Sequence, residues 1–148
     1  MRIATLLRSS AVMAAAGLVA VAAAAPAGAA ETGAFPLCYH AKSKPGAVFM
    51  GLDMIVVTPG KTMSGKATMT QAVNPPLDVK LDVKGGYTDE SNGHMAKLTS
   101  PDMPGRHVTI VLNAAEDWKT ATADYTLWLD TPDGTKTGKL DLVQIHCQ

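Results

Sequence analysis

The feature that most constrains this chain is a regular alternation of apolar and polar residues. Between Leu77 and Lys84, Leu and Val side chains alternate with Asp and Lys side chains. Successive side chains of a β-strand point to opposite faces, so this pattern predicts an antiparallel strand with one buried face and one solvated, charged face. The segment from Thr62 to Thr70 alternates in the same way. Half-buried strands are therefore the expected building unit of the fold.

Turn residues divide the rest of the chain into further strands of similar length. Residues 48–57 are apolar on both faces, which predicts a central strand. No convincing helical stripe occurs after residue 30. We predict an all-β domain, either a single antiparallel β-sandwich or a small β-barrel of about eight strands. The other expected strands are Phe35–His40, His94–Thr99, His107–Asn113, Ala121–Asp130 and Lys139–Cys147, with turns at Thr58–Gly60, Asn74–Pro76, Gly85–Gly86, Ser91–Gly93, Pro101–Gly105 and Thr131–Gly134.

The first thirty residues have the layout of a secretory signal peptide. Arg2 and Arg8 supply a positive start, an Ala-rich run follows over residues 11–25, and small residues up to Ala30 form a cleavage pattern. We therefore predict a signal peptide over residues 1–30 and a single domain over residues 31–148, exported to the periplasm or the medium. The apolar run is too short for a stable span, and Leu37 does not suit a lipoprotein cleavage site, so we expect no membrane anchor on the mature form.

Two cysteines, Cys38 and Cys147, stand near the two ends of the predicted domain. In an oxidising compartment they have one pairing, which would clip the first strand to the last. Closing a loop of roughly 100 residues stabilises a fold by about 4.7 kcal/mol in the chain-entropy treatment. The alternative is a zinc site with His40 and His146. If the last strand continues through Cys147, that residue and His146 point to opposite faces, which favours the disulfide.

The charge of the predicted domain excludes some partners. After loss of the signal peptide, 11 basic side chains stand against 13 acidic ones, a net charge of about −2. Without a basic cluster, the domain lacks the counterion release that drives binding to nucleic acid, and it lacks attraction to an anionic membrane. We expect neither as a partner.

No motif of a known catalytic type occurs in the sequence. There is no Gly-x-Ser-x-Gly turn and no His-Glu-x-x-His helix. Asp89 and Glu90 are adjacent, so in an extended chain their carboxylates diverge and form a poor acid–base pair. Residues 89–93 are rich in oxygen ligands but lack the spacing of a calcium loop. We therefore predict a protein that is not an enzyme and carries no cofactor.

One cluster supports an alternative function. Residues 93–107 carry His94, Met95, Met103 and His107 around a loop rich in Pro and Gly. Thioether and imidazole ligands suit copper, so a periplasmic copper-binding protein is the first alternative. A small inhibitor of an extracellular hydrolase is the second alternative, because it fits the size, the export and the disulfide.

Two tryptophans and one rigid loop are the candidate binding elements. Trp128 alternates out of phase with Tyr125 and Leu127, which predicts an outward side chain. An exposed tryptophan can anchor a glycan or a protein partner. The candidate ligand-binding or partner-binding residues, apart from the copper alternative, are Asn74, Pro75, Pro76, Trp118 and Trp128.

Two stretches resemble a known family. Residues 58–65 and 70–77 resemble the first half of a family of small bacterial domains of unknown function, family 1842 of that series, and Glu116–Lys119 with Ala121, Ala123 and Tyr125 resembles its second half. The resemblance spans most of residues 48–145. It implies no activity and no catalytic residues, and it makes this chain a variant with an added signal peptide and cysteine pair. We predict an uncharacterised exported β-domain that acts as a binding or structural accessory module.

Overall fold

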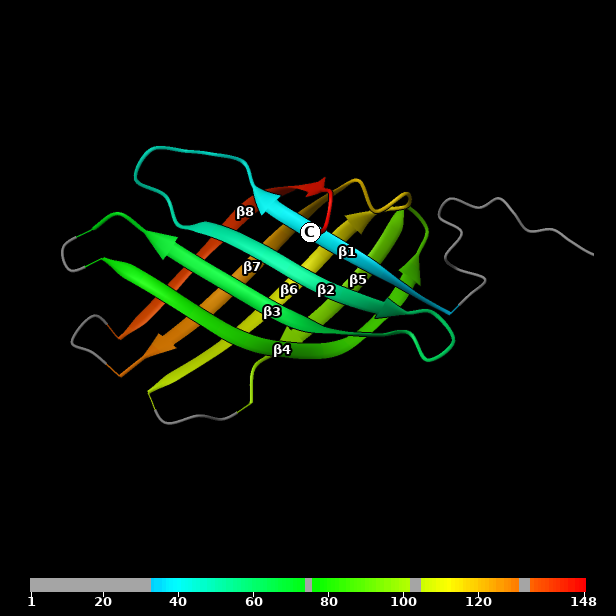
Figure 1. Ribbon diagram of the computed structural model, residues 1–148, viewed down its shortest axis with the longest axis horizontal. Coiled ribbons are helices and arrows are strands. Elements are labelled where there is room, and N and C mark those ends of the chain that lie inside the picture. The colour runs from blue at the N-terminus through cyan, green and yellow to red at the C-terminus, as the bar shows by residue number, and fades with distance from the viewer. Residues whose placement is uncertain (1–32, 74–75, 102–104, 131–133) are drawn as a thin grey trace, which may run out of the picture.

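The fold is a closed barrel of eight antiparallel strands (Figure 1). The structure is a computed structural model that describes residues 33–73, 76–101, 105–130 and 134–148, so the predicted signal peptide lies outside the described residues. The all-β prediction is confirmed, and of its two architectures the barrel is the one that forms. The strands are β1 (Ala34–Ala41), β2 (Phe49–Val57), β3 (Thr62–Gln71), β4 (Leu77–Glu90), β5 (Gly93–Thr99), β6 (Arg106–Ala115), β7 (Thr120–Leu129) and β8 (Thr135–Ile145).

Each strand pairs with the next one in sequence, and β8 returns to pair with β1. In Figure 1, β1 to β4 form the near wall and β5 to β8 the far wall, and the two sets slope in opposite directions, as strand tilt in a barrel requires. The closing ladder is short: its four residue pairs run from Cys38–Ile145 to Ala41–Leu142. The β6–β7 ladder has nine residue pairs, from Arg106–Leu129 to Ala114–Ala121. The β1–β8 seam is therefore a weakly paired part of the wall.

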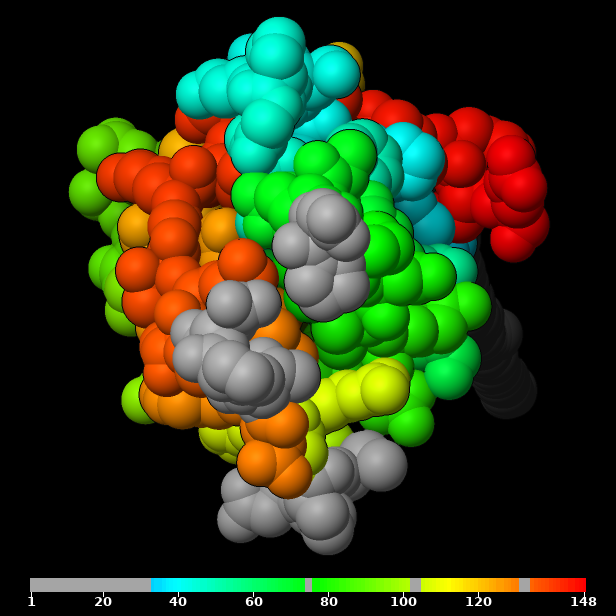
Figure 2. Space-filling view, turned by 90° about the vertical axis from the view of Figure 1, so that its left-hand side faces the viewer, coloured from blue at the N-terminus to red at the C-terminus, as the bar shows by residue number. Residues whose placement is uncertain are grey.

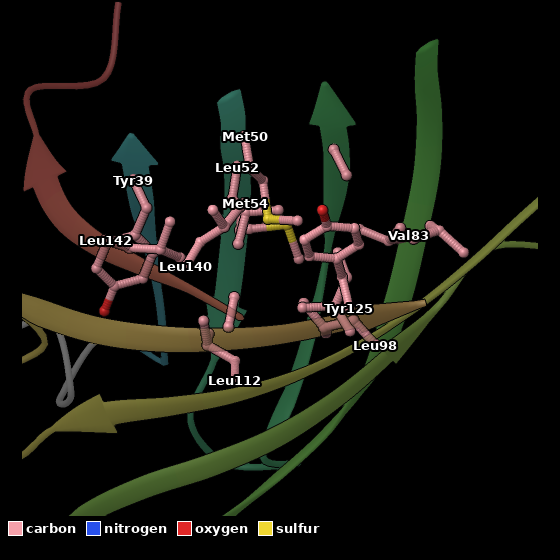
Figure 3. Packing of buried hydrophobic residues seen from close by; sticks show 14 of the residues in the cluster. Tyr39, Met50, Leu52, Met54, Val83, Leu98, Leu112, Tyr125, Leu140 and Leu142 are labelled. Carbon is pink, nitrogen blue, oxygen red and sulfur yellow. The ribbon is translucent and has the colours of Figure 1, made fainter. Parts of the chain in front are cut away.

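Apolar side chains from all eight strands fill the interior. Every second residue of each strand points inward, as the alternation predicts. Figure 3 shows Met50, Leu52 and Met54 of β2 facing side chains from the opposite wall across the centre. Burying one such side chain fully contributes about 1.5–3 kcal/mol, so the interior is the main source of stability. The largest fully buried side chains are Tyr39, Leu37, Met50, Leu52, Met54, Met63, Met69, Leu98, Ile110, Leu112, Leu127 and Leu142.

The predicted turn at Gly85–Gly86 is wrong, because both residues lie inside β4. Gly85 faces the interior at a point where β5 passes very close. A Cβ atom added there would lie 1.8 Å from the carbonyl oxygen of Lys97. A glycine within a strand commonly marks such a close approach of another backbone, and here it allows a 14-residue strand to follow the barrel wall.

Two other strand predictions need correction. β8 begins at Thr135 and ends at Ile145, so His146 and Cys147 lie beyond it. The segment over residues 48–57 holds no special central place, since every strand of a closed barrel has two neighbours. Its second apolar face includes Phe49 and Ile55, which are exposed on the outside of the barrel.

The strands meet their connections at two ends of the barrel. The segments 58–61, 91–92 and 116–119 lie at one end, which we call the Trp118 end. β1, β3, β5 and β7 finish at the other end, where β2, β4, β6 and β8 begin. We call this the Trp128 end, and it faces the viewer in Figure 2. Over the residues described here, the chain forms no helix with the length and apolar character needed to traverse a bilayer.

Candidate functional site

The predicted disulfide is present between Cys38 and Cys147. It joins residues 109 positions apart, with Cα atoms 5.4 Å from each other. Cys38 lies in β1 within the short closing ladder, so the bond reinforces the seam between the first and last strands. A disulfide of this kind persists in an oxidising environment, which agrees with the predicted export.

A surface hollow of about 390 Å³ lies beside the disulfide on the outer face of the barrel. His40, Asp53 and His146 line it together with both cysteines. Asp53 is directly opposite Cys38 in the β1–β2 ladder, and its Oδ1 lies 3.1 Å from the Cys38 sulfur. The strand-based argument that separated His146 from Cys147 fails because β8 ends at Ile145, and both residues line this hollow.

Aromatic rings close the Trp118 end of the barrel. The rings of Trp118 and His94 are stacked, with centroids 4.0 Å apart and planes 7° apart. Tyr87 meets both rings edge-on, and Phe35 packs edge-on against Trp118. Trp118 is thus half-buried in the barrel end, and its ring is held by neighbours on several strands.

The backbone at Trp118 is held in a conformation that non-glycine residues rarely adopt, with a φ of 65°. The Tyr39 hydroxyl donates a hydrogen bond of 2.7 Å to the Trp118 carbonyl oxygen. The Trp118 N–H donates to the carbonyl of Ala115 at 2.9 Å. Left-handed backbone at such a residue costs about 1–3 kcal/mol, so these contacts offset a real penalty. Burial of Tyr39, and secondly the charge of Asp117, raises the pKa of the Tyr39 hydroxyl well above its ordinary value.

His94 is placed between two hydrogen-bond acceptors. Its Nδ1 lies 2.8 Å from Oδ1 of Asp89, and its Nε2 lies 3.1 Å from the carbonyl oxygen of Glu116. A neutral imidazole has one donor nitrogen, so only the doubly protonated ring donates to both partners. Asp89 also pairs with Lys61 at 2.7 Å, and hydrogen bonds from Lys61 and then His94 lower the pKa of Asp89. These polar contacts surround the stacked rings of His94 and Trp118 at the Trp118 end of the barrel.

The exposed tryptophan predicted on the outer face is Trp128, which is 41% exposed. Its ring packs against His107 with centroids 5.0 Å apart. The register places Trp128 directly between His107 of β6 and Thr135 of β8, so the three side chains share the outer face. We call these three residues the aromatic row.

A row of hydroxyl groups runs beside the aromatic row. Thr99 is opposite Thr109, Thr109 is opposite Thr126, and Thr126 is opposite Thr137. Directly opposed residues share a face, so these four threonines, the hydroxyl row, cross β5 to β8 on the outside. The sequence shows threonine at outward positions of these strands, but only the register shows that they align.

The structure separates most of the other sequence-predicted site residues. His94 lies at the Trp118 end and His107 near the Trp128 end, about seven residues apart along the β5–β6 ladder, or roughly 23 Å. Met95 points outward and is 42% exposed, on the face opposite His94. Pro76 is exposed beside the start of β4. Asn74, Pro75 and Met103 lie outside the described residues.

The comparisons with known proteins agree with the resemblance noted in the sequence. No curated protein shows significant sequence similarity to this chain. The profile of one protein family, described as Domain of unknown function (DUF1842), matches residues 32–131. This match covers β1 to β7 and Cys38, and it stops before β8 and Cys147. Since the profile covers more than half of the sequence, the chain belongs to the DUF1842 family of domains of unknown function.

Proposed function

We propose that this chain is an exported, non-enzymatic binding domain that holds a neutral glycan on the outer face of β6, β7 and β8. The observation that carries the proposal is the exposed indole of Trp128 beside the hydroxyl row. A sugar ring offers C–H groups that pack on an indole and hydroxyls that exchange hydrogen bonds with threonine. An aromatic anchor with nearby polar groups that fix orientation is the usual design of a small-molecule site.

The distribution of charge favours a neutral ligand. Over β6 to β8, the aromatic row and the hydroxyl row contain no Asp, Glu, Lys or Arg. Charged residues flank these rows: Asp124 and Lys139 are aligned in the next row, Lys84 is opposite Thr99, and Asp130 is exposed two residues beyond Trp128. An anionic or cationic ligand on Trp128 would therefore lose hydration without gaining a charged partner in either row, whereas a neutral polyhydroxylated ligand would not.

The serine–histidine contact near this face is not arranged for nucleophilic catalysis. The Ser100 hydroxyl lies 3.3 Å from Nδ1 of His107. Ser100 is only 5% exposed, and its oxygen accepts the Val108 N–H at 2.8 Å. A nucleophile must reach its substrate, so this buried hydroxyl is better explained as a structural partner of β6.

Export of the domain rests on the sequence and on the disulfide together. The signal-peptide pattern of residues 1–30 predicts secretion, and the Cys38–Cys147 bond requires oxidising conditions to persist. The copper alternative is not part of the proposal, because the register keeps His94 and His107 about 23 Å apart along the strands. No specific observation favours the hydrolase inhibitor.

The two tryptophans of the chain allow a direct test. Trp118→Phe leaves Trp128 as the one tryptophan fluorophore, and Trp128→Phe leaves Trp118. Each variant is titrated with neutral oligosaccharides built from glucose, mannose, xylose or N-acetylglucosamine. We expect a ligand to change the fluorescence of the variant that keeps Trp128, and Trp128→Ala to weaken binding at least about tenfold, which is 1.4 kcal/mol.

A matched pair of threonine variants tests the hydroxyl row. Thr126→Val removes one hydroxyl beside Trp128 at nearly constant shape and should weaken glycan binding several-fold. Thr88→Val does the same on exposed β4, away from this face, and should leave binding unchanged. The proposed function would be contradicted if no oligosaccharide changed the fluorescence of the variant that keeps Trp128. Equal glycan binding by the unmodified protein and the Trp128→Ala variant would also contradict it.

A further inference from the structure

The two sides of β4 are paired to different extents. β4 pairs with β3 from Leu77 onward, whereas its ladder with β5 begins only at the Lys84–Thr99 pair. Figure 1 shows the first half of β4 continuing beyond the end of β5. Over the residues that the structure describes, no strand pairs with residues 77–83 on the side away from β3. We call this segment the β4 edge.

A surface hollow marks the place where β4 and β5 separate. It measures about 340 Å³, and Asp82, Lys84 and Pro101 are among the residues that line it. Pro101 follows the end of β5, is exposed and has no N–H group to donate to β4. The chain that leaves β5 therefore does not extend the β4–β5 ladder at this residue.

The backbone groups of Asp78, Lys80 and Asp82 point toward the open side of the β4 edge. Successive residues of a strand in an antiparallel sheet bond alternately to the neighbours on its two sides. The Tyr87 N–H donates to the carbonyl of Lys61, directly before β3, at 2.9 Å, so the odd-numbered residues of β4 bond to β3. The even-numbered residues face the other side, where β5 has not yet begun. A row of open N–H and C=O groups of this kind is a template for another strand.

The outward side chains of the β4 edge alternate in charge. Asp78 and Asp82 are negative, and Lys80 between them is positive. The carboxylate of Asp82 pairs with Lys66 of β3 at 2.9 Å. Within the part of the chain that the structure describes, Asp78 and Lys80 have no ion-pair partner. One negative and one positive side chain are therefore available beside the open backbone groups.

We infer that the β4 edge pairs with the β4 edge of a second copy of this chain, in antiparallel orientation, about a two-fold axis at Val79. This register places Asp78 of each copy opposite Lys80 of the other copy, so both open charges gain a partner. Unlike charges directly opposite one another stabilise a strand pair, and like charges destabilise it. An axis at Lys80 would instead place Asp78 opposite Asp82 and Lys80 opposite itself, so the charge pattern disfavours that register.

The existing contacts of β4 favour the axis at Val79 over the next self-complementary register. An axis at Leu81 would need Lys84, whose backbone is already in the β5 ladder, and Asp82, which already pairs with Lys66. The axis at Val79 leaves both of these contacts intact. Charged side chains normally protect a strand edge from other chains, but their alternating signs make the β4 edge complementary to itself.

The first measurement is the molar mass of the protein, with its disulfide intact, by sedimentation equilibrium over a range of concentrations. A single short ladder buries less area than a standard interface, so we expect a reversible dimer with a Kd between roughly 10 and 500 μM. A protein that remains monomeric at about 1 mM, well above that range, overturns the inference.

Two charge reversals test the register. Asp78→Lys places lysines opposite lysines, and Lys80→Asp places aspartates opposite aspartates, so each variant alone should self-associate at least about tenfold more weakly. An equimolar mixture of the two variants restores unlike charges at both positions and should form heterodimers about as well as the unmodified protein dimerises. Single variants that dimerise normally, or a mixture that remains monomeric, overturn the inference.

Lys84→Asp is the matched control for Lys80→Asp. It makes the same change of charge on the same face of β4, but at a position outside the proposed pairing, and should leave the dimer unchanged. A loss of self-association as large as that of Lys80→Asp overturns the axis at Val79.

Amide hydrogen exchange of the unmodified protein provides a readout that does not depend on how the variants fold. In the proposed register the N–H groups of Asp78 and Lys80 donate to carbonyl oxygens of the second copy. Exchange at these two amides should therefore slow as the protein concentration rises through the Kd of the dimer. Exchange rates at Asp78 and Lys80 that do not depend on concentration overturn the inference, even if the protein dimerises through another surface.

Discussion

The indole of Trp118 lies flat on the imidazole of His94, with ring centroids 4.0 Å apart. This contact joins the start of β5 to the turn between β6 and β7, and the polar contacts of His94 with Asp89 and Glu116 anchor it. Aromatic pairs contribute about 0.5–1.5 kcal/mol beyond the area that they bury. The stacked pair therefore both closes and stabilises one end of the barrel.

Replacing Trp118 should destabilise the fold much more than replacing Trp128. Trp118→Ala removes ring contacts with Phe35, Tyr87 and His94, and we expect a loss of about 2–4 kcal/mol, near the lower end for a tryptophan because the residue is half-buried. Trp128→Ala removes an exposed ring and should cost less than about 1 kcal/mol. Urea denaturation of the two variants measures both values, and equal losses would show that the stacked rings do not stabilise the barrel end.

Stability should fall in alkali because of Tyr39. Its pKa is raised by burial, so the folded state resists ionisation of the hydroxyl, whereas the unfolded chain loses the proton near pH ~10. The contribution of Tyr39 is thus fully present below about pH 10 and is lost as the pH rises through the folded-state pKa. Thermal midpoints measured from about pH 8 to pH 11 should decline in the upper part of that range. Tyr39→Phe should show a smaller decline, together with a lower midpoint in the neutral range, because the hydrogen bond to Trp118 is lost.

Substitution by alanine should affect stability very differently at two adjacent glycines, Gly85 and Gly86. Gly85→Ala places a methyl group 1.8 Å from the Lys97 carbonyl oxygen, so we expect a loss of at least about 3 kcal/mol or a shift of β4 against β5. At Gly86 the nearest atom to an added Cβ is 3.4 Å away, and alanine should cost less than about 1 kcal/mol. Urea denaturation midpoints of the Gly85→Ala and Gly86→Ala variants test this explanation. Similar losses of stability in the two variants would refute it.

Reduction of the disulfide should cost about 2–5 kcal/mol. The bond closes a loop between residues 109 apart, and the ladder that it reinforces has four residue pairs. Urea unfolding with and without reductant gives the difference. The Cys38→Ala/Cys147→Ala variant should match the reduced protein and should not respond to reductant. A barrel of unchanged stability would mean that the β1–β8 ladder suffices alone.

Alternation predicts most strand positions, because a half-buried strand has a two-residue period wherever it lies. β5, for example, runs from Gly93 to Thr99, where the pattern predicts His94–Thr99. The same period is present in sandwiches and in barrels, so the choice between them depends on the pairing of Cys38–Ala41 with Leu142–Ile145. Paired glycines commonly form turns, whereas the close approach of Lys97 that explains Gly85 depends on tertiary packing.

The candidate sites are less predictable than the strands. The outward position of Trp128 follows from its place in the alternation of apolar and polar residues along its strand, and the disulfide follows from a cysteine count of two. The hydroxyl row depends on three registers at once, and the contact of Asp53 with Cys38 depends on a fourth. Registers are set by turns and by the packing of the core, so a single sequence does not show them.

The short β1–β8 seam also determines the order in which the barrel can form. Seven of the eight ladders join strands that are neighbours in sequence, and each can form as soon as its second strand is available. The eighth needs β8, so in a chain delivered from its N-terminus β1 keeps one edge unpaired until delivery is almost complete. An unpaired strand edge of this kind can form hydrogen bonds with strands of other chains. Aggregation during biogenesis should therefore depend on the time between the delivery of β1 and the delivery of β8, rather than on the stability of the finished barrel.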